Sequence, residues 1–270
     1  MELKRDLFQL YGLFAILRHC SFDTGEYVTH PSGDSGFNTT CWHVVTSSRD
    51  QDSAIRRESL EELSKTYWYP LFVYLRRKGH SQDQAADYVQ GFFLELIDKD
   101  FLATVSPDKG RFRWFMMSAI GRFVSKQTDK QMAQKRGGAV ATFSLDAEQA
   151  ERRYRQEPLG DWTPQKLFDR RWALEVLANA LDRLKNEHEA RGKLALYEEL
   201  QSTLAGEVLS AEACDEIGAR LDMSPVAVKV AAHRLKEKYR KALVEVVSQT
   251  LTDQEHVDDE LDKLFEALAG

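Results

Sequence analysis

The sequence has few residues of the kinds that interrupt helices or cross-link a chain. It contains 6 prolines and 15 glycines in 270 residues, and they cluster outside the stretches with a helical period. This scarcity favours an all-α fold. The 3 cysteines are odd in number and widely spaced, so they do not make a disulfide framework, and a reducing cytoplasm is the simplest setting.

A hydrophobic run long enough to span a membrane is also missing. The apolar stretch Leu7–Leu17 is too short for a bilayer, and Arg18-His19 follow it where a signal peptide would have small residues. We therefore expect no membrane insertion and treat residues 1–36 as an extension, either disordered or the product of a start site assigned too early. The nearby candidate zinc ligands are Cys20, His30, Cys41 and His43. Their spacing matches no Cys/His template, so we expect no metal and no cofactor.

An overall excess of positive charge, the usual mark of a nucleic-acid-binding chain, is absent, since the net charge is -6. The distribution of charge is uneven, however. Residues 111–136 carry seven Lys or Arg against one acid, residues 229–241 carry six against one, and the last nineteen residues carry seven acids against one lysine. The two basic islands are typical of separate polyanion-binding surfaces, although a basic run can also be an ordinary solvated helix face.

The first basic island alternates with aromatic residues. Phe112, Phe115 and Phe123 recur with a helical period and are predicted to form the core stripe of a helix. Trp114 falls off that stripe, and an aromatic ring beside Arg or Lys can stack on an unpaired base. We therefore expect Trp114 to contact nucleic acid.

A capping box at Ser81-Gln82-Asp83-Gln84 predicts the start of a helix upstream of this island. Its serine and glutamine side chains can each satisfy a backbone N–H group of the other residue. The helix is predicted to reach about Leu96. Its apolar stripe would consist of Ala86, Val89, Phe93 and Ile97.

The second half contains the most specific signal, a helix-turn-helix. Residues 137–163 lack a sustained period and are predicted to be a linker, after which Thr163-Pro164 begins a helix. The motif itself consists of a helix from Ser210 to Leu221, a turn at Asp222-Met223, and a helix from Ser224-Pro225 to about Val247.

The internal pattern of this motif predicts which side chains are buried and which face outward. Ile217, Leu221 and Val228 are expected in the core, and Gly218 is small where the two helices approach each other. The outward set on the second helix is Lys229, His233, Arg234 and Lys236. The start of such a helix can enter a DNA major groove. The alternative is a plain helical hairpin with a basic face.

The order of these segments resembles the sigma-70 family of bacterial RNA polymerase initiation factors, in its compact extracytoplasmic-function (ECF) type. The resemblance covers about residues 37–250. Residues 67–96 (YWYPLFVYLRRKGHSQDQAADYVQGFFLEL) are similar to regions 2.1 to 2.2 of the family. Residues 110–136 (GRFRWFMMSAIGRFVSKQTDKQMAQKR) are similar to its regions 2.3 and 2.4. Region 4.2 is similar to LSAEACDEIGARLDMSPVAVKVAAHRLKEKYRKAL (209–243), and FNTTCWHVV (37–45) resembles a subgroup of the family.

This resemblance implies a domain organisation and a function. Two helical domains joined by a flexible linker are expected: region 2 at 37–136, the linker at 137–163, and region 4 at 164–250, followed by an acidic helix at 251–270. The function implied is that of a cytoplasmic, non-enzymatic sigma factor that binds core RNA polymerase and directs promoter recognition. Its implied partners are the β′ clamp helices, the β flap and promoter DNA, with an anti-sigma factor or a regulatory kinase as further candidates.

The resemblance also implies three sets of binding residues. Polymerase binding falls to Asp83, Asp87, Gln90, Phe93 and Leu94. Binding of the −10 element falls to Arg113, Trp114, Arg122, Lys126 and Lys130. Binding of the −35 element falls to Ser224, Lys229, His233, Arg234 and Lys236.

The sequence departs from the family pattern at three places. Gly121-Arg122 stands where region 2.3 usually has Arg-Asn, Asp222 replaces the turn glycine, and Val230-Ala231 replaces a frequent Ser-Arg. Fewer hydrogen-bonding groups remain for base edges, so −35 recognition is expected to depend on Lys229, His233 and DNA shape.

The sequence leaves two other function classes as alternatives to a sigma factor. A helix-turn-helix regulator without stable polymerase binding would leave the aromatic and basic helix around Trp114 unexplained. An enzyme would need converging carboxylates or metal ligands, and the acids Glu58, Glu61 and Glu62 are predicted on a solvated helix face.

The acidic tail after the capping box Thr252–Glu255 allows two interpretations: it competes with DNA for the recognition helix, or its apolar stripe extends the core.

Overall fold

The computed structural model describes residues 53–97, 111–133, 144–157, 160–251 and 256–269. All regular structure in these ranges is helical, which confirms the all-α prediction. The chain forms two compact units. The N-terminal unit contains the described residues up to Glu175 together with 248–251 and 256, and the C-terminal unit contains Val176–Val247 and Val257–Ala269. The predicted extension 1–36, the segment 37–45 and the capping box at 252–255 lie outside the described residues.

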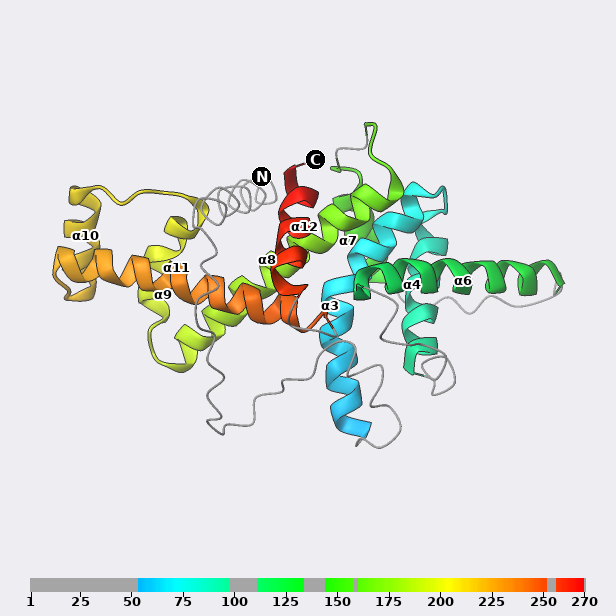
Figure 1. The fold of residues 1–270 in the computed structure, drawn as a ribbon, viewed down its shortest axis with the longest axis horizontal. Helices are drawn as coiled ribbons and strands as arrows, with labels where there is room; N and C mark the ends of the chain where they lie inside the picture. The colour runs from blue at the N-terminus through cyan, green and yellow to red at the C-terminus, as the bar shows by residue number, and fades with distance from the viewer. Residues whose placement is uncertain (1–52, 98–110, 134–143, 158–159, 252–255, 270) are drawn as a thin grey trace. The chain divides into compact units, whose positions relative to one another are not determined.

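Three helices build the core of the N-terminal unit: α3 (Ser53–Arg77), α4 (Gln82–Ile97) and α6 (Phe112–Ala133). Helix α4 packs against both α3 and α6 (Figure 1). Aromatic edges join them, since the Tyr67 and Phe112 ring centroids lie 5.4 Å apart and those of Phe92 and Phe123 lie 6.0 Å apart. Burying each such ring contributes roughly 1.5–3 kcal/mol, so these contacts fix the orientation of α6.

The turn between α3 and α4 follows the local signals in the sequence. Helix α3 ends before Gly79, whose φ of 96° is accessible to glycine without strain. The capping box then begins α4 as predicted: the Ser81 N–H donates to Gln84 Oε1 at 3.0 Å, and the Gln84 N–H donates to Ser81 Oγ at 3.2 Å. Two backbone donors at the helix start are thereby satisfied.

Part of the predicted linker is an ordered helix, α7 (Ser144–Tyr154), that packs against α3 and α4. Its buried face consists of Ala147, Ala150 and Tyr154, together with the carboxylate of Glu151. Arg76 of α3 holds that carboxylate with two hydrogen bonds, from Nε at 2.8 Å and from Nη2 at 3.0 Å. A face of two alanines and a tyrosine carries little hydrophobic signal, which is why the sequence predicted only a linker for these residues.

A buried charge cluster fastens the residues after α7 to the same unit. The Glu157 side chain is completely buried, accepts a hydrogen bond from the Tyr69 hydroxyl at 2.8 Å, and binds the Arg171 guanidinium. Arg170 Nη1 lies 3.7 Å from the same carboxylate. The Arg153 guanidinium stacks 3.8 Å above the Tyr69 ring. Burial raises the pKa of Tyr69, so its hydroxyl remains a proton donor.

Helix α8 (Pro164–Ala190) begins at the predicted cap, where the Lys166 N–H donates to Thr163 Oγ1 at 3.2 Å. The predicted boundary at residue 164 coincides with the start of this helix. The compact units divide farther along it, between Glu175 and Val176. The first turns of α8 therefore belong with α3, α4, α6 and α7.

The C-terminal unit contains the rest of α8, then α9 (Leu194–Leu200), the short 3-10 helix η3 (Gln201–Ala205), α10 (Ala211–Leu221), α11 (Pro225–Ser248) and α12 (Val257–Ala269). Helix α11 is joined to α8 by Tyr239, whose buried hydroxyl donates to the Leu177 carbonyl at 3.3 Å. The same helix pair is joined by Lys238, whose Nζ lies 2.8 Å from Glu187 Oε1. This hydrogen bond is the main reason that the pKa of Glu187 lies below its usual value.

Helix α12 buries one side and exposes an acidic one. Its buried apolar residues are Leu261, Leu264, Phe265 and Leu268. Its exposed acids are Asp258, Asp259, Asp262 and Glu266. The predicted apolar stripe is confirmed, and it is buried as the packing interpretation of the tail requires.

Candidate nucleic-acid interface

Helices α10 and α11 form the predicted helix-turn-helix, with α10 beside the start of α11 (Figure 1). Ser210 caps α10 by accepting the Ala213 N–H at 3.1 Å. Cys214, Ile217 and Gly218 are buried in this helix, and Val228 is buried in α11. Leu221 is only half-buried, which is less than predicted.

The turn between these helices requires both of the residues that the sequence singled out. A Cβ atom at Gly218 would lie 2.5 Å from the Met223 carbonyl oxygen, so a side chain there would force the helices apart. Asp222 adopts the left-handed conformation with φ 53° and ψ 47° and is the one non-glycine residue in the described ranges with positive φ. Aspartate tolerates this conformation better than most residues, which allows it to replace the family's glycine.

The exposed face of α11 presents the predicted −35 residues. Ser224 Oγ caps the helix by accepting the Ala227 N–H at 3.2 Å, which leaves the hydroxyl proton available to an outside acceptor. Lys229, His233 and Arg234 are exposed, and Lys236 is half-buried. His233 Nδ1 lies 3.8 Å from Glu237 Oε1 one turn later. The arrangement offers cations and donors on the first turns of a helix that can enter a groove.

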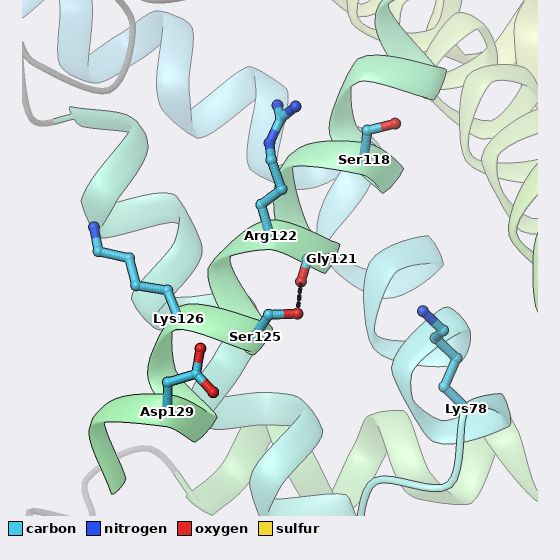
Figure 2. A pocket seen from close by; sticks show the side chains of 7 residues that line it. All are labelled: Lys78, Ser118, Gly121, Arg122, Ser125, Lys126 and Asp129. Atoms are coloured by element: carbon cyan, nitrogen blue, oxygen red, sulfur yellow. Dashed lines mark hydrogen bonds between the residues drawn. The ribbon is translucent and has the colours of Figure 1, made fainter. Parts of the chain in front are cut away.

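A second polar surface lies on α6 in the N-terminal unit. It is a groove of about 770 Å³ that receives one lysine, Lys78, from the turn after α3 and is otherwise lined by α6 (Figure 2). The α6 residues are Ser118, Gly121, Arg122, Ser125, Lys126 and Asp129. A Cβ atom at Gly121 would meet nothing within 4 Å, so the missing side chain leaves the groove open beside Arg122.

Trp114 is near the start of the same helix and is exposed by 51%. The Arg111 guanidinium lies 5.4 Å from the centroid of its ring. The predicted separation of Trp114 from the core stripe is therefore confirmed, because Phe112 and Phe123 are buried and Phe115 is half-buried. An exposed indole beside arginine suits stacking on a base.

Helix α4 presents an exposed stripe on the side away from its core. Asp83, Asp87, Gln90 and Leu94 are spaced by four, three and four residues, so they share one face of the helix. Asp83 and Asp87 are exposed, Gln90 is half-buried, and Leu94 is exposed by 62%. This face of α4 therefore combines two carboxylates, one amide and one exposed apolar side chain.

Comparison with known proteins agrees with this arrangement. The family described as ECF sigma factor matches residues 61–245, from within α3 to the last turn of α11. No curated protein and no solved structure gives a significant match.

The chain belongs to the ECF sigma factor family.

ECF sigma factors are non-enzymatic initiation factors that direct transcription from promoters, and the family binds core RNA polymerase, promoter DNA and anti-sigma factors. In the described part of this sigma factor, no helix is long and apolar enough to cross a membrane. The same residues contain no group of three or more potential metal ligands. The four candidate zinc ligands before residue 44 lie outside the described ranges.

Two predicted contact residues of the sigma factor lie in its interior. Arg113 is 3% exposed, its Nη1 lies 3.7 Å from Asp169 Oδ1, and its guanidinium lies 4.7 Å from the Trp172 ring centroid. Phe93 is 9% exposed, with its ring 5.9 Å from that of Phe92. Both side chains are part of the core in this structure, so neither is exposed as a predicted contact residue should be. The Lys130 side chain lies outside the described residues.

Several exposed residues of this sigma factor were missed by the sequence reasoning. Lys78 follows the end of α3, and only the packing of α3 and α6 brings it to the groove. Ser118 and Ser125 could not be identified from the sequence, because small polar residues carry no periodic signal. Val226 and Val230 of α11 are exposed by 71% and 43%, and their positions off the buried stripe could have indicated this.

Proposed function

We propose that this protein binds core RNA polymerase through the exposed stripe of α4 and directs it to promoters. In this proposal α11 recognises the −35 element, while Trp114 and the α6 groove bind the −10 element as its strands separate. The protein would act in the cytoplasm, where bacterial polymerase works. No catalytic group or cofactor is required of it.

The observation that carries the proposal is the exposed Trp114 beside the basic groove, in a unit separate from the helix-turn-helix. A regulator that only occupies duplex DNA needs a helix-turn-helix but no aromatic platform for unpaired bases. Stacking contributes roughly 1–3 kcal/mol per base, which is useful only where bases leave the duplex. The family match across both units supports the same interpretation.

The α4 stripe supplies a direct test. The double substitution Asp87→Ala with Leu94→Ala removes an exposed charge and the exposed apolar group while leaving the buried face of α4 intact. Exposed apolar anchors typically contribute a few kcal/mol at an interface. We expect the variant to lose co-elution with core polymerase and to yield at least tenfold less run-off transcript.

The matched control is Glu148→Ala with Val208→Ala, which removes an exposed acid and an exposed apolar residue elsewhere. This variant should co-elute with core polymerase like the wild type. Unchanged co-elution of the α4 variant would refute the assignment of α4. A wild-type chain that binds duplex DNA but never co-elutes with core polymerase would instead favour the helix-turn-helix regulator.

A further inference from the structure

The recognition helix α11 exposes two valines at its start. Val226 is 71% exposed and Val230 is 43% exposed, whereas Val228 between them is fully buried. Residues four apart on a helix are neighbours, with their Cβ atoms about 5–6 Å apart. The two side chains therefore form one small apolar patch, which no residue in the described part of the C-terminal unit covers.

Charged and polar residues share the face on which this patch lies. Lys229 and His233 follow Val226 by three and seven residues, so all four side chains form one stripe along α11. Lys229 and His233 are exposed. A patch flanked by a cation and an imidazole is complementary to a polyanion rather than to an apolar protein surface.

The stripe has few of the groups that usually discriminate base edges. Bidentate hydrogen bonding falls mostly to Arg or Lys on guanine and to Asn or Gln on adenine, and of these the stripe contains only Lys229, with Arg234 exposed one turn after Val230. The Ser224 hydroxyl oxygen accepts the Ala227 N–H, which leaves only the hydroxyl proton for an acceptor on a base edge. The major groove also offers an apolar feature, the C5-methyl group of thymine, which isolated aliphatic side chains can contact.

Resting on the proposed −35 role of α11, we infer that Val226 and Val230 recognise thymine methyl groups in the major groove. The ligand class is duplex DNA with a C5-methylated pyrimidine at two neighbouring or next-neighbouring base pairs, because the spacing of the valines spans one to two steps of 3.4 Å. Specificity at these positions then comes from methyl burial, and Lys229 and His233 supply the polar contacts around it.

The test removes the methyl groups from the DNA without changing its base pairing. The −35 element is first selected from a randomised duplex library with the full chain assembled on core polymerase. Each selected thymine is then replaced by deoxyuridine, which lacks the C5-methyl group and keeps the hydrogen-bonding groups. We expect two positions no more than two base pairs apart where deoxyuridine lowers affinity about fourfold, the effect of exposing one methyl group.

The protein variants assign each methyl group to a valine. Val226→Ala should abolish the deoxyuridine effect at one position and Val230→Ala at the other, and each should lower affinity for the thymine duplex by a similar factor. Alanine has a higher helix propensity than valine, so α11 should remain folded. Val208→Ala is the control, because Val208 is 87% exposed but precedes α10.

The outcomes separate this inference from the proposed function. A holoenzyme that selects no −35 element would contradict the proposed function itself. A selected element without thymine at such positions, or variants that keep the full deoxyuridine effect, would overturn methyl recognition alone. Valine variants that weaken binding to core polymerase and leave DNA binding unchanged would show that the patch is a protein contact, and would overturn it too.

Discussion

Neighbouring residues at the start of α6 have opposite environments. Arg113 is 3% exposed and lies against Trp172, whereas Trp114 is 51% exposed. A helix turns by about 100° per residue, since it has 3.6 residues per turn, so one position is enough to move a side chain from the core to the surface. Arg113 therefore packs inside the N-terminal unit, and the indole of Trp114 is exposed on its surface.

Strand opening should depend on this indole. If Trp114 stacks on an unpaired base of the −10 element, Trp114→Ala should still form the closed complex but open the duplex at least fivefold less, because stacking contributes roughly 1–3 kcal/mol. Permanganate reactivity of thymines in the −10 region measures the opening. Trp114→Phe keeps a stacking surface and should retain most of it. Normal thymine reactivity in the alanine variant would assign the residue a structural role only.

At the scale of helices and their junctions, the sequence was most informative where the signals are local. Hydrogen bonds at Ser81 and Ser210 confirm the predicted helix starts, because a cap involves residues only three apart. Periodicity placed Phe93 in the apolar stripe of its helix, and the structure buries it there. The contact roles of Phe93 and Arg113 came from the family resemblance, which assigns a position without showing whether its side chain is exposed.

The ordered helix α7 could not be predicted for a different reason. The packing of α7 and of the residues that follow it depends on pairs such as Arg76 with Glu151 and Tyr69 with Glu157, which are 75 and 88 residues apart in sequence. Charged residues in a sequence usually predict an exposed segment. The residues of a buried charge cluster are therefore easily predicted to be a loop. The α6 groove was missed likewise, because Lys78 reaches it only through tertiary packing.

The cluster around Glu157 should stabilise the N-terminal unit strongly. Glu157→Gln keeps the size of the side chain but leaves the guanidinium groups of Arg170 and Arg171 buried, at 5% and 6% exposure, without their carboxylate. Removing one partner of a buried pair typically costs about 3–5 kcal/mol. We expect thermal unfolding followed by circular dichroism to show a melting temperature lower by several degrees.

A surface acid on the neighbouring helix α7 provides the comparison for this variant. Glu148 is 69% exposed and lies 3.9 Å from Arg152, so Glu148→Gln should change the stability by less than about 0.5 kcal/mol. Equal melting temperatures for the two variants would mean that the Glu157 cluster contributes no more than a surface pair.

Across the whole molecule, opposite charges are gathered on different helices. Cations are exposed on α6 and α11, and exposed acids gather on α12, which lies beyond the family match. Because the apolar side of α12 is buried, its charge can be changed without removing the helix. The two interpretations of the acidic tail can therefore be separated.

If the tail competes with DNA, neutralising it should strengthen DNA binding. The triple substitution Asp258→Asn, Asp259→Asn and Asp262→Asn should raise the affinity of the free chain for a −35 duplex about two- to tenfold at low salt, since exposed pairs contribute up to about 1 kcal/mol. The difference should close as salt rises.

The control for this triple variant is Asp182→Asn with Glu189→Gln and Glu198→Gln, which changes the net charge equally at exposed positions elsewhere in the C-terminal unit. It measures the general effect of net charge on DNA binding. If both triple variants bind alike, α12 has no specific role in competition and serves only in packing.

Cys214 is completely buried within the helix-turn-helix, so the reactivity of its thiol can report how readily the motif opens. A thiol with no exposed surface reacts with an alkylating reagent only when α10 opens locally, so the reaction rate measures the free energy of that opening. With Cys20 and Cys41 replaced by serine, the labelling rate would belong to this position alone. Bound DNA that stabilises the closed motif slows labelling in proportion to its occupancy. The labelling rate of Cys214 would thus report promoter binding from inside the fold, without a probe on the DNA-facing surface.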